Sequence, residues 1–269
     1  MADASERVAR GLELIGAART VDGATLLHPT WAEVRPGELV GVIGPSGAGK
    51  STLLGLLAGL APPSSGHVLL GGVEVHEELL ASLRGRIGFV PQDDVVHLPL
   101  DVRTCLDYAA RLRLPRATEA ERALVVARVL REVALEQRAD LAVGRLSGGQ
   151  RKRVSIGVEL TGAPEVLVLD EPTSGLDAAT EKQLMALLRG LADAGRAVVL
   201  TTHATESLDA LDQLWVLCDG RLVYGGAPID AFSISRFAGG IIPDEKLWSE
   251  FDPELVATFR QMRGEAGHA

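Results

Sequence analysis

The chain has 269 residues, 46% of them hydrophobic, which is enough for one large domain with a packed core and excludes a disordered polymer. Its formal net charge of −9 argues against a protein whose main partner is nucleic acid. The two cysteines, Cys105 and Cys218, stand far apart in apolar surroundings, which indicates reduced, partly buried thiols and neither a disulfide nor a metal site.

The N-terminus and the apolar runs bear on where the protein acts. The first ten residues, MADASERVAR, carry charges where a secretory signal needs an apolar stretch, so we do not expect secretion. The longest apolar run, LLGLLAGLAPP at Leu53 to Pro63, is too short to cross a bilayer and ends in two prolines. We therefore expect a soluble chain that reaches a membrane only by binding a protein already there.

The first hundred residues predict short strands around one helix. Residues 12–43 read as strands separated by turns, one of them at Pro36-Gly37. A helix is expected from Lys50 to Leu60, followed by a PPSSG turn and by strands around HVLLGG and RIGFVPQ.

From about Asp101 to Leu160 the pattern changes to helices only, and one of them opens with a capping box of Thr118 and Glu121. Strand and helix then alternate again, from VLVLD through a leucine-rich helix to RAVVLTT and QLWVLCDG. This alternation predicts a mostly parallel sheet covered by helices and interrupted by a helical insertion. The tail, residues 241–262, looks helical around a break at Pro253.

The strongest motif is GPSGAGKST, which fits G-x-x-x-x-G-K-[ST] between a predicted strand and a predicted helix. Its glycines let the backbone curl so that N–H groups point at nucleotide phosphates, and Lys50 adds a positive charge. The Ser51 hydroxyl is a candidate Mg²⁺ ligand, and Thr52 lies at the positive end of the helix. A chance glycine-rich turn is the alternative, and the flanking elements argue against it. The predicted nucleotide-binding residues are Gly44, Pro45, Ser46, Gly47, Ala48, Gly49, Lys50, Ser51 and Thr52.

A second motif, EVLVLDEP, places two acidic residues at the end of a buried strand. Ligands of open α/β sheets bind at this carboxyl edge, so Asp170 is expected to hold Mg²⁺ directly or through water. Glu171, pointing to the other side, is expected to face the attacking water as general base. The alternative is an acidic helix N-cap with no catalytic role, and the presence of a P-loop argues against it.

A third motif, LSGGQRKR at Leu146 to Arg153, is a second glycine-rich turn that feeds a helix and so makes another anion-binding nest. The three basic residues that follow suggest a nucleic-acid patch, but we favour a solvated helix face. Why one chain carries two nests is not explained by the residues alone.

Together, the P-loop, LSGGQ, LVLDEP, SGLD and TTH, in that order, resemble the nucleotide-binding domain of ABC ATPases over about residues 10–225. IGFVPQDD, LSGGQRKRVSIGVEL and DEPTSGLD resemble the White/ABCG-type branch and its bacterial relatives, which are mostly exporters. By position, the resemblance makes Gln92 a residue that touches Mg²⁺ and the attacking water, Asp177 a residue of the dimer seam, and His203 a γ-phosphate contact.

The resemblance also accounts for the second nest. In ABC ATPases two subunits meet head to tail, and each places its LSGGQ over the ATP held in its partner's P-loop. Ser147, Gly148, Gly149 and Gln150 are then expected to contact the partner's nucleotide. The implied fold is an α/β P-loop NTPase core with an antiparallel N-terminal β subdomain and a helical subdomain at about residues 101–160. The expected division is an ATPase domain at 10–230 and a mostly helical extension at 231–269.

One feature departs from many ABC domains, which stack the adenine on an aromatic residue some distance before the P-loop. Our alignment puts Val21 at that position. Without a ring, about 1 kcal/mol of stacking is missing, so the preference for ATP over GTP is left open.

The sequence is thus interpreted as the ATPase subunit of an ABC transporter, a homodimer or a heterodimer with another ATPase subunit, on the cytoplasmic face of the cell membrane. A separate permease subunit is expected to dock on Asp93 to Arg103, with Asp94 and Arg103 as contacts, although an ordinary surface loop is the alternative there. ATP and Mg²⁺ are the expected cofactors, and no nucleic acid is expected. The alternatives are a non-transport ABC ATPase acting on DNA or the ribosome, and a nucleotide-binding regulator that does not hydrolyse.

Overall fold

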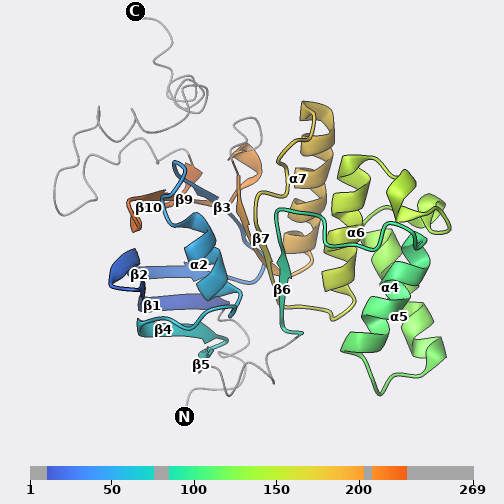
Figure 1. Ribbon diagram of the computed structural model, residues 1–269, viewed down its shortest axis with the longest axis horizontal. Coiled ribbons are helices and arrows are strands. Elements are labelled where there is room, and N and C mark those ends of the chain that lie inside the picture. The colour runs from blue at the N-terminus through green and yellow to red at the C-terminus, as the bar shows by residue number, and fades with distance from the viewer. Residues whose placement is uncertain (1–10, 76–84, 203–207, 229–269) are drawn as a thin grey trace, which may run out of the picture.

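Two β-sheets enclose helix α2 (Lys50–Leu57), and further helices cover the outer face of the larger sheet. The computed structural model describes residues 11–75, 85–202 and 208–228 (Figure 1). Leu53, Leu54, Leu56 and Leu57 of α2 are fully buried, and they pack with apolar residues of both sheets. Helix α2 therefore holds the two sheets together by burying apolar surface on both sides.

The smaller sheet is antiparallel and has the order β2-β1-β4-β5. Its strands alternate between buried and exposed positions along much of their length, as expected for a sheet with one face in the core. The strands are β1 (Leu12–Val21), β2 (Ala24–Val34), β4 (Ser65–Leu70) and β5 (Val73–Glu74).

The larger sheet has the order β10-β9-β3-β8-β7-β6, in which only the β9–β10 pair is antiparallel. Strands β3, β7 and β8 are buried at every position, which explains why VLVL and AVVLT read as continuous apolar runs. The strands are β3 (Leu39–Ile43), β6 (Ile87–Val90), β7 (Val166–Leu169), β8 (Ala197–Thr201), β9 (Gln213–Cys218) and β10 (Arg221–Gly226).

Three helices form a layer of their own beside the sheets, which we call the helical layer, and α7 lies between this layer and the larger sheet (Figure 1). The helical layer contains α4 (Val102–Arg113), α5 (Glu119–Glu132) and α6 (Gly148–Leu160). The remaining helices of the described residues are α7 (Ala178–Asp193) and the 3-10 turns η1 (Glu136–Arg138), η2 (Val143–Arg145) and η3 (Leu208–Ala210).

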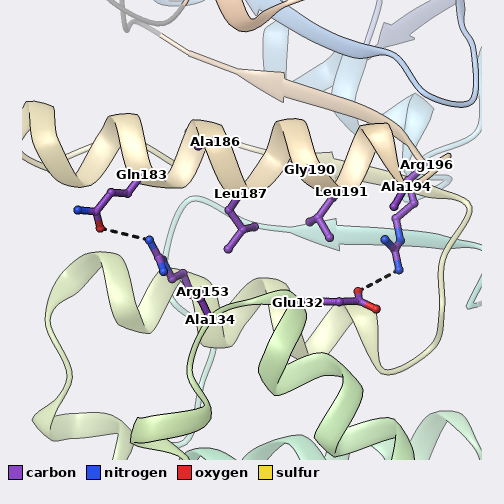
Figure 2. Close-up of a pocket in the computed structure, with 10 residues that line it drawn as sticks. All are labelled: Glu132, Ala134, Arg153, Gln183, Ala186, Leu187, Gly190, Leu191, Ala194 and Arg196. Carbon is purple, nitrogen blue, oxygen red and sulfur yellow. Dashed lines mark hydrogen bonds and ion pairs between the residues drawn. The ribbon is translucent and has the colours of Figure 1, made fainter.

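A groove of about 780 Å³ separates α7 from the helical layer. Figure 2 shows two polar contacts across it: Arg153 donates to Gln183 at 3.3 Å, and Arg196 donates to Glu132 at 3.0 Å. The groove is lined by Glu132, Ala134, Arg153, Gln183, Ala186, Leu187, Gly190, Leu191, Ala194 and Arg196.

The predicted architecture is confirmed: an antiparallel N-terminal sheet, a mostly parallel core sheet and an inserted helical layer. The Thr118–Glu121 capping box forms, and both cysteines are buried and form no disulfide. The predicted end of the first helix at Leu60 is wrong, because α2 ends at Leu57 and Gly59 adopts a left-handed φ of 68°. The expected helical tail, residues 241–262, lies outside the described residues, and the division at residue 230 stays a prediction.

Candidate functional site

The P-loop, residues 44–52, joins the end of β3 to the start of α2. Gly49 is the N-cap of α2 with φ of 97°, and it makes no side-chain cap. Any side chain there would be strained, and its Cβ would come within 2.8 Å of the Leu26 carbonyl oxygen. The first turn of α2 therefore begins without a side-chain cap, as expected for an anion-binding helix N-terminus.

Lys50 turns its ammonium back over the loop that precedes it. Nζ donates to the carbonyl oxygens of Gly44 at 2.8 Å and Pro45 at 3.1 Å, and the residue is only 9% exposed. Burial lowers the pKa of Lys50 below its ordinary 10.5, while the negative charges of Glu171 and Asp170 oppose that shift. The lysine is thus a desolvated cation whose charge an arriving phosphate would stabilise.

A cavity of about 580 Å³ opens beside the P-loop, and we call it the nucleotide cavity. It brings together P-loop residues, Glu171, the first residues of β2 and the turn between β9 and β10. The lining residues are Thr25, Leu26, Ser46, Gly47, Gly49, Lys50, Ser51, Thr52, Glu171, Asp219 and Gly220.

Asp170 and Glu171 follow the last residue of β7, and their neighbour on β8 is Thr201. The Thr201 hydroxyl donates to Asp170 Oδ1 at 2.7 Å and accepts from the Glu171 N–H at 2.7 Å. Glu171 has a φ of 42°, an uncommon value for a residue with a side chain. Backbone strain of this kind, fixed by a hydrogen bond from the neighbouring strand, is typical of functional positions.

Gln92 follows strand β6 and reaches the same edge of the sheet. Its Nε2 donates to Glu171 Oε2 at 3.0 Å. The predicted pairing of these two residues around an attacking water is therefore compatible with their positions, since both lie at the carboxyl ends of adjacent parallel strands.

The residues at this edge fit a magnesium ion bound together with a nucleotide. Ser51 lines the cavity with an exposed hydroxyl, and the charge of Asp170 acts on the adjacent Lys50. Among the described residues, no three His, Cys, Asp or Glu side chains gather to hold a metal ion. A hard cation here would take part of its oxygen ligands from phosphates, which is how Mg²⁺ is held with few protein ligands.

The LSGGQ turn, Leu146–Gln150, lies outside the nucleotide cavity of its own chain, because none of its residues lines that cavity. Ser147 and Gln150 form a capping box that closes the N-terminus of α6. A side chain on Gly149 would collide with Thr180 of α7, so this glycine permits the close approach of the two helix starts.

Asp177, predicted at a dimer seam, is the N-cap of α7. It accepts hydrogen bonds from the Thr180 hydroxyl at 2.7 Å and the Thr180 N–H at 3.0 Å, which lower the pKa of its carboxyl. His203 lies outside the described residues.

One expectation for exposed residues is corrected. Lys152, in the basic run read as a solvated face, is 5% exposed and donates to the Gln92 carbonyl oxygen at 2.7 Å. Asp94 is partly buried, with its Oδ1 3.0 Å from Lys152 Nζ, and its expected contact with a permease stays a prediction. Sequence reasoning also missed Thr201, although the TTH motif contained it. It missed Thr25 and Leu26 as well, which line the nucleotide cavity, whereas Val21, aligned with the adenine-stacking position, does not.

Comparison with known proteins identifies the family. The sequence profile described as "ABC transporter" matches residues 27–174, which is more than half of the chain. The chain belongs to the ABC transporter family. It is an ATP-binding domain of this family, an ABC ATPase. None of its described helices combines the length and hydropathy needed to cross a bilayer.

Its relatives are longer transporter proteins. The ABC transporter ATP-binding/permease protein Rv1747 of Mycobacterium tuberculosis is 52% identical over 221 residues, which are 81% of this chain and 25% of that protein. ABC transporter G family member 22 of Arabidopsis thaliana is 42% identical over 208 residues, 74% of this chain and 27% of that protein. This ABC ATPase thus spans about a quarter of the length of both.

Solved structures agree with the fold. The structure of cbiO1 from Clostridium perfringens, part of the ABC transporter complex cbiONQ, has a TM-score of 0.79 and 26% identity, covering 95% of this chain and 99% of that one. The dimeric post-hydrolysis state of the ATP-binding cassette MJ0796, bound to ADP and Pi, has a TM-score of 0.71 and 27% identity, covering 80% and 98%.

Proposed function

We propose that this ABC ATPase hydrolyses MgATP at the interface of a head-to-tail dimer and thereby drives transport, in the export direction, through a permease part. The observation that carries the proposal is the meeting of Lys50 and Glu171 at one cavity, with Gln92 bonded to Glu171, while the LSGGQ turn of the same chain lies outside it. On this proposal each chain supplies one half of a site, and its partner supplies the other half.

Nucleotide binding is assigned to the P-loop. Backbone N–H groups of residues 44–52 at the uncapped start of α2 would hold the phosphates, and Lys50 would exchange its carbonyl contacts for phosphate oxygens. Ser51 and Asp170, with Gln92, would hold Mg²⁺, which supplies positive charge opposite the β- and γ-phosphates.

For hydrolysis, Glu171 is proposed to take the proton of the attacking water, and Gln92 is proposed to orient Glu171 and that water. The strained φ of Glu171 and its N–H bond to Thr201 fix the direction of the carboxylate, so it is positioned before the nucleotide arrives. His203 is proposed to contact the γ-phosphate.

The second half of each site would come from the partner's Ser147, Gly148, Gly149 and Gln150, with Asp177 along the seam. The Ser147–Gln150 capping box leaves this turn preformed, so a γ-phosphate would meet a helix N-terminus that is already folded. Loss of that phosphate on hydrolysis would remove the contact and let the dimer open.

The transport role is supported by the relatives. Rv1747 is named as an ATP-binding/permease protein, and the solved structure of cbiO1 is described as part of a transporter complex. We propose that this domain acts with a permease part at the cytoplasmic face of the cell membrane, with a copy of itself or a second ATPase as its dimer partner. Export rests on the resemblance to the ABCG-type branch, whose members are among the relatives.

The dimer is tested with Glu171→Gln, which keeps the shape of the side chain and removes the proton acceptor. Loss of a general base costs about 10²- to 10⁴-fold in rate, so ATP should stay bound and intact. Light scattering should give a mass near twice 28.4 kDa with MgATP and a monomer with MgADP.

Adding Ser147→Arg should abolish the ATP-dependent dimer and leave nucleotide affinity at the chain's own P-loop intact. This double variant is the matched control, because its P-loop, Asp170 and Gln92 are unchanged. A dimer that persists with Ser147→Arg, or an equal loss of nucleotide binding by the monomer, contradicts the trans site.

A further inference from the structure

Lys152 is a buried cation on the helix that begins with the LSGGQ turn. Its Nζ donates to the carbonyl oxygens of Gln92 at 2.7 Å and Pro91 at 3.4 Å, and it lies 3.0 Å from Asp94 Oδ1. An ammonium has three N–H donors, and a single short segment, residues 91–94, meets all of them. We call these four residues the Q segment.

Asp94 extends this attachment over about one turn of α6. Its Oδ1 also accepts from the Ser155 hydroxyl at 3.3 Å, and its Oδ2 lies 3.7 Å from Arg151 Nε. Arg151 in turn donates to the carbonyl oxygen of Leu146 at 2.7 Å, the residue before Ser147. The Q segment is therefore bound to α6 at 151, 152 and 155, within two turns of the signature serine.

The opposite face of α6 is held differently. There the groove of Figure 2 runs between α6 and α7, and the α7 side presents the small residues Ala186 and Gly190. The polar contact from α6 across it is the exposed 3.3 Å bond from Arg153 to Gln183. The buried ionic attachment of α6 is thus on the Q-segment side, where a lost contact leaves a desolvated charge without its partner.

We propose that Lys152 is a positioning residue that passes the state of a chain's own nucleotide cavity to the LSGGQ turn which that chain offers to its partner. The inference rests on the proposed function, because it assumes that LSGGQ acts in trans. The path is short: Glu171 Oε2 accepts from Gln92 Nε2, the Gln92 carbonyl accepts from Lys152, and a continuous helix leads from Lys152 to Ser147. A shift of Gln92 on nucleotide binding moves α6 as a unit.

The test uses Lys152→Met, which keeps the length of the stem and removes the three donors. Arg153→Met is the matched control, since it removes a charge from the next residue of the same helix, on the groove side. The full chain is studied at concentrations where light scattering gives a monomer. Amide hydrogen exchange at residues 146–150 is measured with and without a non-hydrolysable MgATP analogue, beside analogue affinity by calorimetry.

In the wild type and in Arg153→Met, the analogue should change exchange at residues 146–150. In Lys152→Met that change should be lost, while analogue affinity stays at the wild-type value. In steady-state assays kcat of Lys152→Met should fall by about tenfold, the size expected of a lost coupling contact, together with its cooperativity in ATP. Lys152→Arg, which retains charge and donors, should restore part of both.

If circular dichroism shows that Lys152→Met does not fold, Asp94→Asn decides the matter, because it weakens the same attachment from the Q segment. The inference is overturned if exchange at residues 146–150 responds in Lys152→Met as in the wild type. It is also overturned if the wild type binds the analogue without any such response, and this result leaves the dimer proposal intact. Failure of the Glu171→Gln chain to dimerise with ATP overturns the dimer proposal and removes the trans role from this inference.

Discussion

The Thr201 hydroxyl donates a 2.7 Å hydrogen bond to Oδ1 of Asp170. The Thr201 hydroxyl oxygen also accepts the N–H of Glu171 at 2.7 Å, so one buried side chain, Thr201, fixes both acidic residues at the end of β7. Parallel pairing of Leu169 with Leu200 makes this possible, because the next residues along the two segments, Asp170 and Thr201, then lie side by side. A strand neighbour therefore determines how the proposed metal ligand and the proposed general base point.

Replacing Thr201 with valine keeps the shape and removes the hydroxyl. The partly buried N–H of Glu171 loses its acceptor, which should cost about 1 kcal/mol of unfolding free energy in urea titrations. Asp170 also loses the donor that orients it, so the Mg²⁺ concentration needed for half-maximal ATPase activity should rise.

Thr161→Val is the matched control, since Thr161 is also buried and its hydroxyl donates to the Val158 carbonyl at the far end of α6. It should lower stability without moving the Mg²⁺ dependence. If both variants shift the Mg²⁺ dependence equally, the effect is one of general stability and Thr201 has no special role.

Lys50 should make the affinity for nucleotide fall at alkaline pH. Burial lowers its pKa in the free protein, and phosphates would raise it again on binding. Affinity is therefore highest while Lys50 is charged, and it falls as pH rises through the lowered pKa, below the 10.5 of an ordinary lysine. Calorimetry from neutral pH upward, in buffers of different ionisation enthalpy, should detect proton uptake that grows with pH.

Lys50→Met should bind MgATP much more weakly and should lose this proton uptake, with an unchanged circular dichroism spectrum. Unchanged affinity in the variant would contradict the assignment of the P-loop. Proton uptake that survives the substitution would assign the titration to a different group.

The sequence predicted the parts of the site that are local, and it missed those that depend on pairing between distant segments. The P-loop and the Asp170–Glu171 pair each follow a buried strand, in a short segment whose own residues specify its structure, so short motifs suffice. The bond from Lys152 to the Gln92 carbonyl joins residues 60 positions apart, and that from Thr201 to Asp170 joins residues 31 apart. From the sequence alone, a lysine in a basic run is expected to be exposed to solvent, because the sequence does not show which distant loop packs against it.

The proposed permease contact, residues 93–103, contains both exposed and partly buried side chains. Val95 and Leu98 are 75% and 51% exposed, so they are available to a partner, whereas Asp94 is bound to Lys152. Changing Val95 and Leu98 together to serine should leave the ATPase rate of the isolated domain unchanged and lower transport in vesicles that contain the permease part. Arg103→Ala, which removes an exposed ion pair with Asp140, should act in the same direction.

Asp94→Asn should behave differently from these variants and lower the ATPase rate of the isolated domain, because it weakens the attachment of α6. If the Val95 and Leu98 changes lower the ATPase rate of the isolated domain as much as they lower transport, the surface is not a docking site. Transport equal to that of the wild type would rule it out as well.

The base of the nucleotide is expected at the end of the cavity formed by Thr25, Leu26, Asp219 and Gly220. The Leu26 carbonyl lies next to Gly49, and Leu26 lines this end of the cavity with 42% of the residue exposed. An aliphatic residue is therefore present where a ring would stack. Leu26→Tyr should add about 1 kcal/mol of stacking, which is about a fivefold gain in affinity for both ATP and GTP.

Val21→Tyr is the control, because Val21 is similarly exposed but does not line the cavity. It should leave both affinities unchanged, and inorganic triphosphate, which has no base, should bind equally to the wild type and both variants. Since stacking depends on a π face that every base has, the gain at Leu26 should not distinguish ATP from GTP. A larger gain from Val21→Tyr than from Leu26→Tyr would place the base beside the β1–β2 turn and reverse this assignment.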